Sequence, residues 1–330
     1  MRLTKTIFLV LCIYGCSSDK QVYQYPHAGE QEPRTDKAFD NGNDKFSFIV
    51  HSDLTGGERP GIFEVAVEQM NLLRPEFIVN VGDLIDGGPA DSTLWNQQWD
   101  WYDERANRAK APLFYTGGNH DLTGNFAQGI WKERLGRPYY HFVYKNTLFL
   151  VLDSEDHGPE RQDEIEAIRN EGVRIYEEEG PVAYTKSTYA KLPERKWGNI
   201  GKEQAASMIE AIQANPNAQW TFLMLHKPVW NDPDDLNFKA IEDALAGRNY
   251  TVFHGHTHNF VYNQRRGMDY INLGTTGGSQ NSTIGRSVDH FFWVTVDNES
   301  ATIANLLMEG ILDKYGQIPA GGDTLTFENK

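Results

Sequence analysis

The stretch Gly118-Asn119-His120-Asp121 follows an apolar run, residues 111–116, and its first residue completes the pair Gly117-Gly118. An apolar run of this length predicts a buried strand, and the glycines predict a loop at its end. Asn119 offers an amide oxygen, His120 a titratable imidazole and Asp121 a carboxylate that can orient that imidazole. The same residue types are also typical of ordinary turns, so the rest of the chain has to decide between a turn and a functional site.

Other apolar runs end in polar residues in the same way. Asp53 and Asp83 each follow a strand-like run, and a helical pattern separates the two runs. A strand, a helix and a strand in so short a span predict a parallel βαβ unit, which places both aspartates at one edge of the sheet. The strand-like runs are residues 46–52, 77–81, 219–225 and 250–253. With Asn119, the polar residues at the strand ends are Asp53, Asp83, Asn119, His226, His256 and His258.

This set has the chemistry of a metal site. A single histidine at a strand end is usually a structural residue with a hydrogen-bond partner. Three histidines and two aspartates gathered at one edge would be costly unless a cation neutralised them. Nitrogen and oxygen ligands together suit divalent transition metals.

The same blocks resemble those of the calcineurin-like metallophosphoesterase family, which includes the purple acid phosphatases. They stand here as Asp53-Leu54-Thr55, Gly82-Asp83, Gly118-Asn119-His120-Asp121, His226 and Gly255-His256-Thr257-His258. The resemblance covers roughly residues 46–307. It implies an α/β (α+β) fold in which two β-sheets pack face to face and helices flank them, as four αββα layers.

The resemblance also implies a role for each ligand. Asp83 would bridge two metal ions. Asp53 and His258 would bind the first ion, while Asn119, His226 and His256 would bind the second. The ions would be manganese, iron or zinc.

The implied reaction is hydrolysis of a phosphate monoester or diester by attack of a metal-bound water. His120 would contact the phosphoryl oxygen or protonate the leaving group, and Asp121 would hold its ring. The sequence contains neither a Gly-x-Ser-x-Gly elbow nor a phosphate-binding Walker loop. Arg59 and Lys227 are candidate phosphate contacts, although charged residues are most often simply solvated.

One position departs from the family pattern. The first block has a histidine in the family and Thr55 here. A hydroxyl is a weaker ligand than an imidazole, so we expect the first metal site to be weak. His51 could replace the missing ligand, because side chains two residues apart on a strand share a face. We favour the alternative that His51 points into the sheet and forms a hydrogen bond there.

The first residues resemble a bacterial lipoprotein signal. Arg2 and Lys5 precede an apolar stretch, residues 7–15, that is too short to span a bilayer. Cys16 follows, and the other cysteine of the chain, Cys12, lies in the same segment. We expect Cys16 to be acylated and the protein to be anchored in the bacterial cell envelope. The alternative is an ordinary signal peptide with an incidental cysteine.

The expected organisation has one large domain. Along the chain we expect a signal peptide over residues 1–15, a polar tether over 16–44, the metallophosphoesterase domain over 45–310 with an insertion over 157–198, and a tail over 311–330. The net charge of −15 over 330 residues argues against a surface that coats nucleic acid, since that function requires a basic footprint. The aromatic residues of the insertion either form a lid or pack the insertion onto the body.

Two other functions compete with hydrolysis. A non-catalytic envelope protein could keep the fold and bind a partner or a metal. However, such a protein has no use for His120 and Asp121. A metal-scavenging lipoprotein would instead be expected to carry clustered surface histidines or cysteines.

Overall fold

The computed structural model describes residues 22–27, 29–39, 45–280, 286–297 and 300–308. The predicted signal peptide, Cys16 and the predicted tail over 311–330 lie outside the described residues. Within the described ranges, no helix is both long and apolar enough to cross a lipid bilayer.

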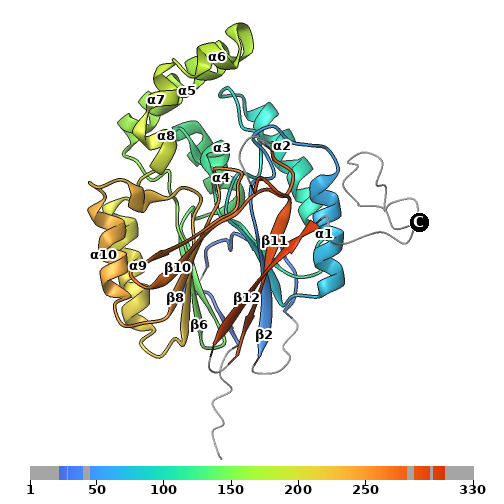
Figure 1. The fold of residues 1–330 in the computed structure, drawn as a ribbon, viewed down its shortest axis with the longest axis vertical. Helices are drawn as coiled ribbons and strands as arrows, with labels where there is room; N and C mark the ends of the chain where they lie inside the picture. Colours follow the sequence, from blue (N-terminus) through green and yellow to red (C-terminus); the bar gives the residue numbers. More distant parts are fainter. Residues whose placement is uncertain (1–21, 28, 40–44, 281–285, 298–299, 309–330) are drawn as a thin grey trace, which may run out of the picture.

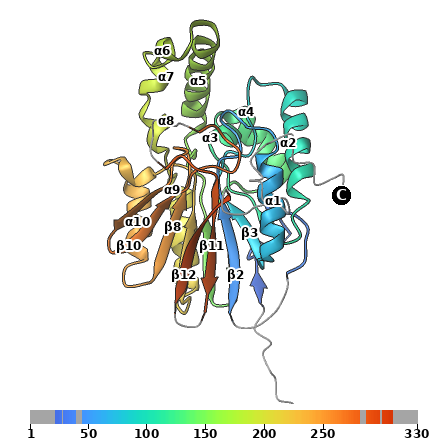
Figure 2. The ribbon, with the colours of Figure 1, turned by 45° about the vertical axis from the view of Figure 1, so that its right-hand side comes forward.

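Two β-sheets form the centre of the molecule (Figures 1 and 2). The seven-stranded sheet contains, in spatial order, β1 (Tyr23–Gln24), β5 (Tyr140–Tyr144), β6 (Thr147–Val151), β7 (Trp220–Met224), β8 (Tyr250–His254), β10 (Met268–Asn272) and β9 (Val261–Arg265). The five-stranded sheet contains β12 (Ala301–Leu307), β11 (His290–Val296), β2 (Phe46–His51), β3 (Phe77–Asn80) and β4 (Leu113–Phe114).

Aromatic side chains fill the space between the sheets. Phe142 and Phe149 stack with ring centroids 4.6 Å apart, and Phe48 contacts Phe149 edge-on at 5.2 Å. Because helices cover the outer faces as well, central strands such as β3 are buried on both sides and appear in the sequence as continuous apolar runs.

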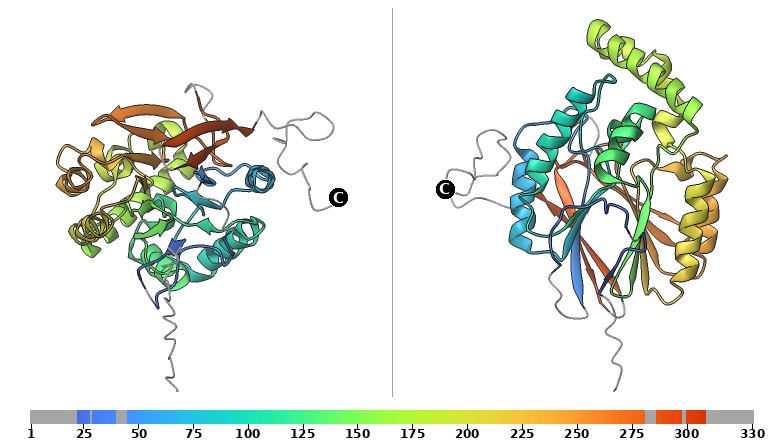
Figure 3. Two further views of the ribbon diagram at one scale, coloured as in Figure 1. Left: turned by 90° about the horizontal axis from the view of Figure 1, so that it is seen from below. Right: turned by 180° about the vertical axis from the view of Figure 1, so that it is seen from behind.

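Helices cover both outer faces (Figure 3). On the five-stranded sheet they are α1 (Ile62–Leu73), α2 (Ser92–Ala106) and α4 (Asn125–Leu135). On the seven-stranded sheet they are α9 (Lys202–Ala214) and α10 (Leu236–Ala244). The predicted αββα layers are therefore confirmed.

The insertion after β6 is helical and rises above the carboxyl ends of the parallel strands (Figures 1 and 2). Its helices are α5 (Pro159–Glu179), α6 (Pro181–Tyr184), α7 (Thr188–Lys191) and α8 (Pro193–Trp197). The remaining elements are α3 (Asn119–Leu122) and η1 (Val229–Asn231). Since ligands of open α/β sheets bind at the carboxyl ends of the strands, the insertion lies beside the expected site.

The last four strands divide between the two sheets. β9 and β10 extend the seven-stranded sheet through parallel pairing of β10 with β8. In contrast, β11 pairs antiparallel with β2 and extends the five-stranded sheet. The pattern of apolar residues does not reveal which distant strand pairs with β10 or β11, because this pairing depends on how the two sheets pack.

The described part of the predicted tether is packed on the body. β1 pairs antiparallel with β5, with Tyr23 opposite Tyr144, and Arg34 forms a bridge with Phe114 of the other sheet. Aromatic residues account for this packing: Phe39 lies 5.3 Å from the Tyr144 ring, between centroids. The segment is polar on average, so its composition did not indicate that a few aromatic residues pack on the body.

Candidate metal centre

Four of the six predicted ligands have positive backbone φ angles. Asp53, Asp83, His256 and His258 have φ angles of 51°, 59°, 78° and 54°. Non-glycine residues rarely adopt this left-handed region, and residues that do so gather at functional sites. The loops after β2, β3 and β8 are thus shaped to turn these side chains toward one another.

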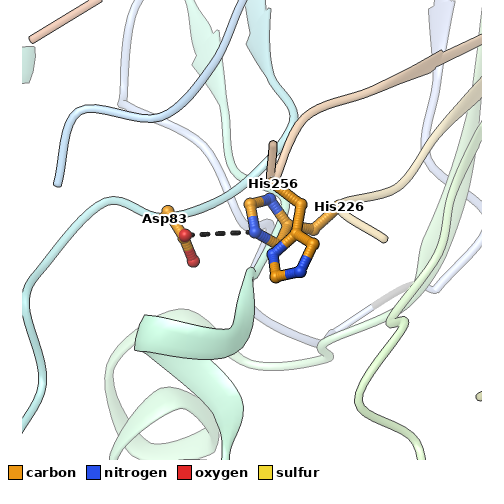
Figure 4. Close-up of side chains that lie close together, drawn as sticks. All are labelled: Asp83, His226 and His256. Atoms are coloured by element: carbon orange, nitrogen blue, oxygen red, sulfur yellow. Dashed lines mark ion pairs between the residues drawn. The ribbon is translucent and has the colours of Figure 1, made fainter. Parts of the chain in front are cut away.

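Asp83 is shared by two groups of ligand atoms. Its carboxylate lies with His226 and His256 in one group and with Asp53 and His258 in the other, and within each group all ligand atoms are within 4.8 Å of one another. Asp83 Oδ2 is 3.1 Å from His226 Nε2 (Figure 4). Asp53 Oδ1 is 3.3 Å from His258 Nε2. The structure therefore brings together five of the six predicted ligands in the predicted grouping.

Backbone carbonyls fix the orientation of two imidazoles. His226 Nδ1 donates to the Val81 carbonyl oxygen at 2.9 Å, and His258 Nδ1 donates to the Ser279 carbonyl oxygen at 2.7 Å. In each ring, Nε2 is then the atom that faces the carboxylates. Metal-binding histidines commonly have their second nitrogen fixed in this way.

The carboxylates give the centre a strong affinity for positive charge. Burial alone would lower the pKa of His226, but the neighbouring Asp83 raises this pKa to about 9. Burial likewise opposes protonation of His258, whereas the hydrogen bond and charge of Asp53 raise its pKa to about 9. The charge of His226 outweighs burial of Asp83, so the pKa of Asp83 falls well below its usual range. In the protein without metal, protons therefore occupy positions that suit a cation.

Asn119 supplies the sixth candidate ligand. Its side chain is 6% exposed, and its Oδ1 has no hydrogen-bond partner among the described residues. A buried amide oxygen without a partner is costly. A cation at this point would satisfy it, so the residues present fit a two-metal centre.

The glycines of the motifs are required by close packing. A Cβ on Gly118 would lie 2.3 Å from Asp83 Oδ1, and a Cβ on Gly255 would lie 2.3 Å from Asp53 Oδ2. Any larger residue would displace a ligand carboxylate. The motif glycines thus allow the backbone to approach the ligands.

His120 lies beside the centre. Its backbone N–H donates to Asp83 Oδ1 at 3.0 Å, and its ring Nδ1 donates to the Asp86 carbonyl oxygen at 2.8 Å. The Nε2 atoms of His120 and His258 face a common point: a Cβ placed on Gly56 would be 3.6 Å from the first and 3.2 Å from the second. His120 Nε2 is therefore presented toward the ligand groups.

Asp121 does not hold the ring of His120, and in this respect the structure differs from the expectation. The buried Asp121 carboxylate accepts hydrogen bonds from the backbone N–H groups of Leu84 at 2.9 Å, Ile85 at 3.1 Å and Gly118 at 2.8 Å. Burial, followed by the charge of Asp83, raises its pKa to about 7. Asp121 thus connects the two loops that carry Asp83 and Asn119.

Thr55 and His51 both lie outside the two ligand groups. The Thr55 hydroxyl is buried and donates to the Ile85 carbonyl oxygen at 2.9 Å. His51 is buried too, and its Nδ1 lies 3.1 Å from Thr276 Oγ1. This is the arrangement that we favoured from the sequence, with His51 hydrogen-bonded inside the fold.

The two candidate phosphate contacts have protein partners. Arg59 forms an ion pair with Asp289, with Nη1 2.9 Å from Oδ2. Lys227 is buried, and its Nζ lies 2.6 Å from Glu155 Oε1. Both positively charged side chains therefore pair with carboxylates of the protein itself. Sequence reasoning missed the contact between Asp86 and His120, since a backbone carbonyl makes it and any residue could supply that group.

Comparison with known proteins identifies the family. A model of the calcineurin-like phosphoesterase family matches residues 46–260. The chain belongs to this family. Over 232 residues it is 23% identical to the manganese-dependent ADP-ribose/CDP-alcohol diphosphatase of Homo sapiens, a match that covers 60% of this chain and 68% of the human protein.

Solved structures share the fold of this calcineurin-like phosphoesterase. One is a dimetal phosphatase from Danio rerio, with a TM-score of 0.55 and 13% identity over 79% of this chain and 96% of that chain. Another is PhoD, with a TM-score of 0.51 and 14% identity over 81% and 69% of the two chains. By its family and its human relative, the chain is a hydrolase that acts on phosphoric ester bonds.

Proposed function

We propose that the protein hydrolyses a phosphate monoester or diester with two cations held at the carboxyl ends of its strands. The observation that carries this proposal is the position of Asp83, whose carboxylate belongs to both groups of ligand atoms. Bound there, two divalent cations act as Lewis acids toward a phosphoryl oxygen and activate water. Asp53 and His258 would hold the first cation, and Asn119, His226 and His256 the second.

The side chains of the chain itself would orient the substrate and manage protons. His120 Nδ1 is fixed by the Asp86 carbonyl, so Nε2 is free to bind a phosphoryl oxygen or to pass a proton to the leaving group. A non-catalytic binding protein would not need a titratable group in this position. The human relative acts on ADP-ribose and CDP-alcohols by its name, which supports a phosphate ester as substrate.

The proposal is tested with purified protein reconstituted separately with manganese, iron and zinc. Hydrolysis of an aryl phosphate monoester and an aryl phosphate diester is measured with each metal. We expect metal-dependent turnover that Asp83→Asn abolishes. Asp243→Asn is the matched control, because Asp243 forms only surface ion pairs with Lys239 and Arg266. Turnover that survives Asp83→Asn would refute the assignment.

We further propose that the protein works in the bacterial cell envelope, with a lipid on Cys16 as its anchor. The short positive region, the apolar stretch and the cysteine that follows it support this location.

A further inference from the structure

Two arginines of the insertion have no carboxylate partner among the described residues. They are Arg169 on α5, which is 7% exposed, and Arg195 on α8. The other arginines of the insertion behave differently. Arg161 pairs with Glu164 at 2.7 Å and also with Glu194, while Arg174 pairs with Glu171 at 2.7 Å and also with Glu178. In a segment so rich in glutamate, two guanidinium groups without a carboxylate partner among the described residues require an explanation.

Arg169 lies directly behind His120. Its Nη2 donates to the Asp86 carbonyl oxygen at 3.4 Å, and the same oxygen accepts the hydrogen bond from His120 Nδ1. This long contact uses one of the five N–H donors of the guanidinium. Helix α5 is fixed in this position, because Gln162 Oε1 accepts a hydrogen bond from the backbone N–H of Gly124 at 2.9 Å.

Arg195 is held beside the loop that carries His226. Lys227 donates from Nζ to the carbonyl oxygen of Glu194, the preceding residue of α8, at 3.0 Å. The guanidinium packs on two rings, with its centre 5.6 Å from the Tyr184 centroid and 5.7 Å from that of Tyr189. Its Nε donates to Tyr184 Oη at 3.1 Å. The two terminal nitrogens have no hydrogen-bond partner in the described part of the chain.

Both arginines are thus attached to ligand-bearing loops and still have unused donors. Arg169 is buried and has one long hydrogen bond to a backbone carbonyl, while Arg195 is partly exposed. Burying a guanidinium without a counter-charge is unfavourable, so an anion from solution is expected to complete the arrangement. The planar fork of arginine matches phosphate oxygens, which it binds through charge-assisted pairs of hydrogen bonds.

The position of Arg169 indicates which anion this is. Arg169 lies on the Nδ1 side of the His120 ring, whereas Nε2 faces the ligand groups. The ring therefore separates this guanidinium from the place where the reacting phosphoryl group would lie. We propose that Arg169 and Arg195 form a subsite for a second phosphoryl group of the substrate. The substrate is then a phosphate ester that carries a second phosphate, an inference that rests on the proposed function.

Inhibition by two anions tests this subsite. On this proposal, orthophosphate would occupy the reacting position alone, whereas methylenediphosphonate, whose P–C–P link is not hydrolysed, would occupy both positions. Inhibition of aryl phosphate hydrolysis is measured at a fixed excess of free manganese, because the diphosphonate chelates metal. We expect Arg169→Gln and Arg195→Gln each to weaken methylenediphosphonate binding about 10- to 100-fold, the range for a lost charge-assisted hydrogen bond. Orthophosphate binding should change by less than about 3-fold.

Two further variants control for charge and folding. Arg174→Gln removes a cation from the same helix, and it should leave both inhibition constants unchanged because Arg174 pairs with exposed glutamates. Arg169→Lys keeps the charge without the planar fork, so its effect should lie between wild type and Arg169→Gln. If Arg169→Gln unfolds, as shown by circular dichroism, the less buried Arg195→Gln decides the question.

Calorimetric titration of methylenediphosphonate into the manganese-loaded protein separates the subsite from the reaction. A protein that hydrolyses no ester but binds the diphosphonate through these arginines would refute the proposed function and retain the subsite. A protein that hydrolyses aryl esters but loses affinity for both anions equally in the variants has no second-phosphate subsite. The subsite is likewise refuted if neither arginine variant weakens the binding of methylenediphosphonate.

Discussion

His120 Nδ1 donates a 2.8 Å hydrogen bond to the backbone carbonyl of Asp86, three residues after the shared ligand Asp83. The loop that supplies Asp83 therefore also fixes the tautomer of His120, since a carbonyl oxygen can only accept. Nε2 is left to act on the substrate, and no side chain is needed to orient the ring.

This relationship predicts different effects for neighbouring substitutions. His120→Ala should lower kcat by ~10²–10⁴, the range for general acid–base groups, and should leave metal content unchanged. Asp86→Ala should keep activity near that of wild type, because the backbone carbonyl remains. Steady-state kinetics and elemental analysis check both. Loss of metal from His120→Ala would instead place His120 among the metal ligands.

Asp83 should matter more for metal content than any other ligand. Asp83→Ala should empty both positions, whereas His226→Ala should mainly empty one, because His226 belongs to a single ligand group. Metal per protein is measured after gel filtration. Equal losses in the two variants would rule out the bridging role.

The first metal position should be the weaker one. Thr55→Val should leave metal content unchanged and destabilise the fold by about 1 kcal/mol, because the hydroxyl donates to the Ile85 carbonyl oxygen. Thr55→His should add an imidazole and raise bound metal when metal is limiting. Chelator titration with elemental analysis follows both variants. An unchanged stoichiometry in Thr55→His, together with metal loss in His51→Ala, would make His51 the missing ligand.

The metal-free protein should lose stability as the pH rises. The folded pKa of His226 and of His258 is about 9, above the ordinary value of 6.5. Their protonation therefore stabilises the fold fully below pH 6.5, and this stabilisation disappears as the pH rises through about 9. Urea unfolding at several pH values should show the decline, and His258→Gln should reduce it. His141→Gln is the control, because burial lowers the pKa of His141 to about 4 and keeps it neutral in this range.

Cys16 should carry the lipid. Cys16→Ala should abolish labelling with a radioactive fatty acid and release the protein from the membrane fraction. Cys12→Ala should retain both properties, since the proposed acylation uses only the cysteine that follows the apolar stretch. Equal labelling of wild type and Cys16→Ala would disprove the anchor.

The ligands were predictable because each follows a strand, and apolar runs in the sequence mark where these strands lie. The role of Asp121 was not predictable, since its partners are backbone N–H groups of Leu84, Ile85 and Gly118. Helix α5 was not predictable either. Much of it is exposed, and it therefore lacks a clear apolar stripe. The pairing of β11 with β2 was also hidden, because it joins opposite ends of the sequence.

The packing of β1 has a consequence for the proposed lipid anchor. Tyr23 pairs with Tyr144 at the end of β5, and β5 runs antiparallel to β6. Tyr23 therefore leaves the sheet at the end opposite to the metal centre. Between Cys16 and Tyr23 the chain can extend no more than about 25 Å. If Cys16 carries a lipid, this short link would hold the body close to the bilayer, with the metal centre at the end of the sheet away from the attachment point. The centre would then face substrates dissolved in the aqueous phase and not the headgroups of the membrane that carries the protein.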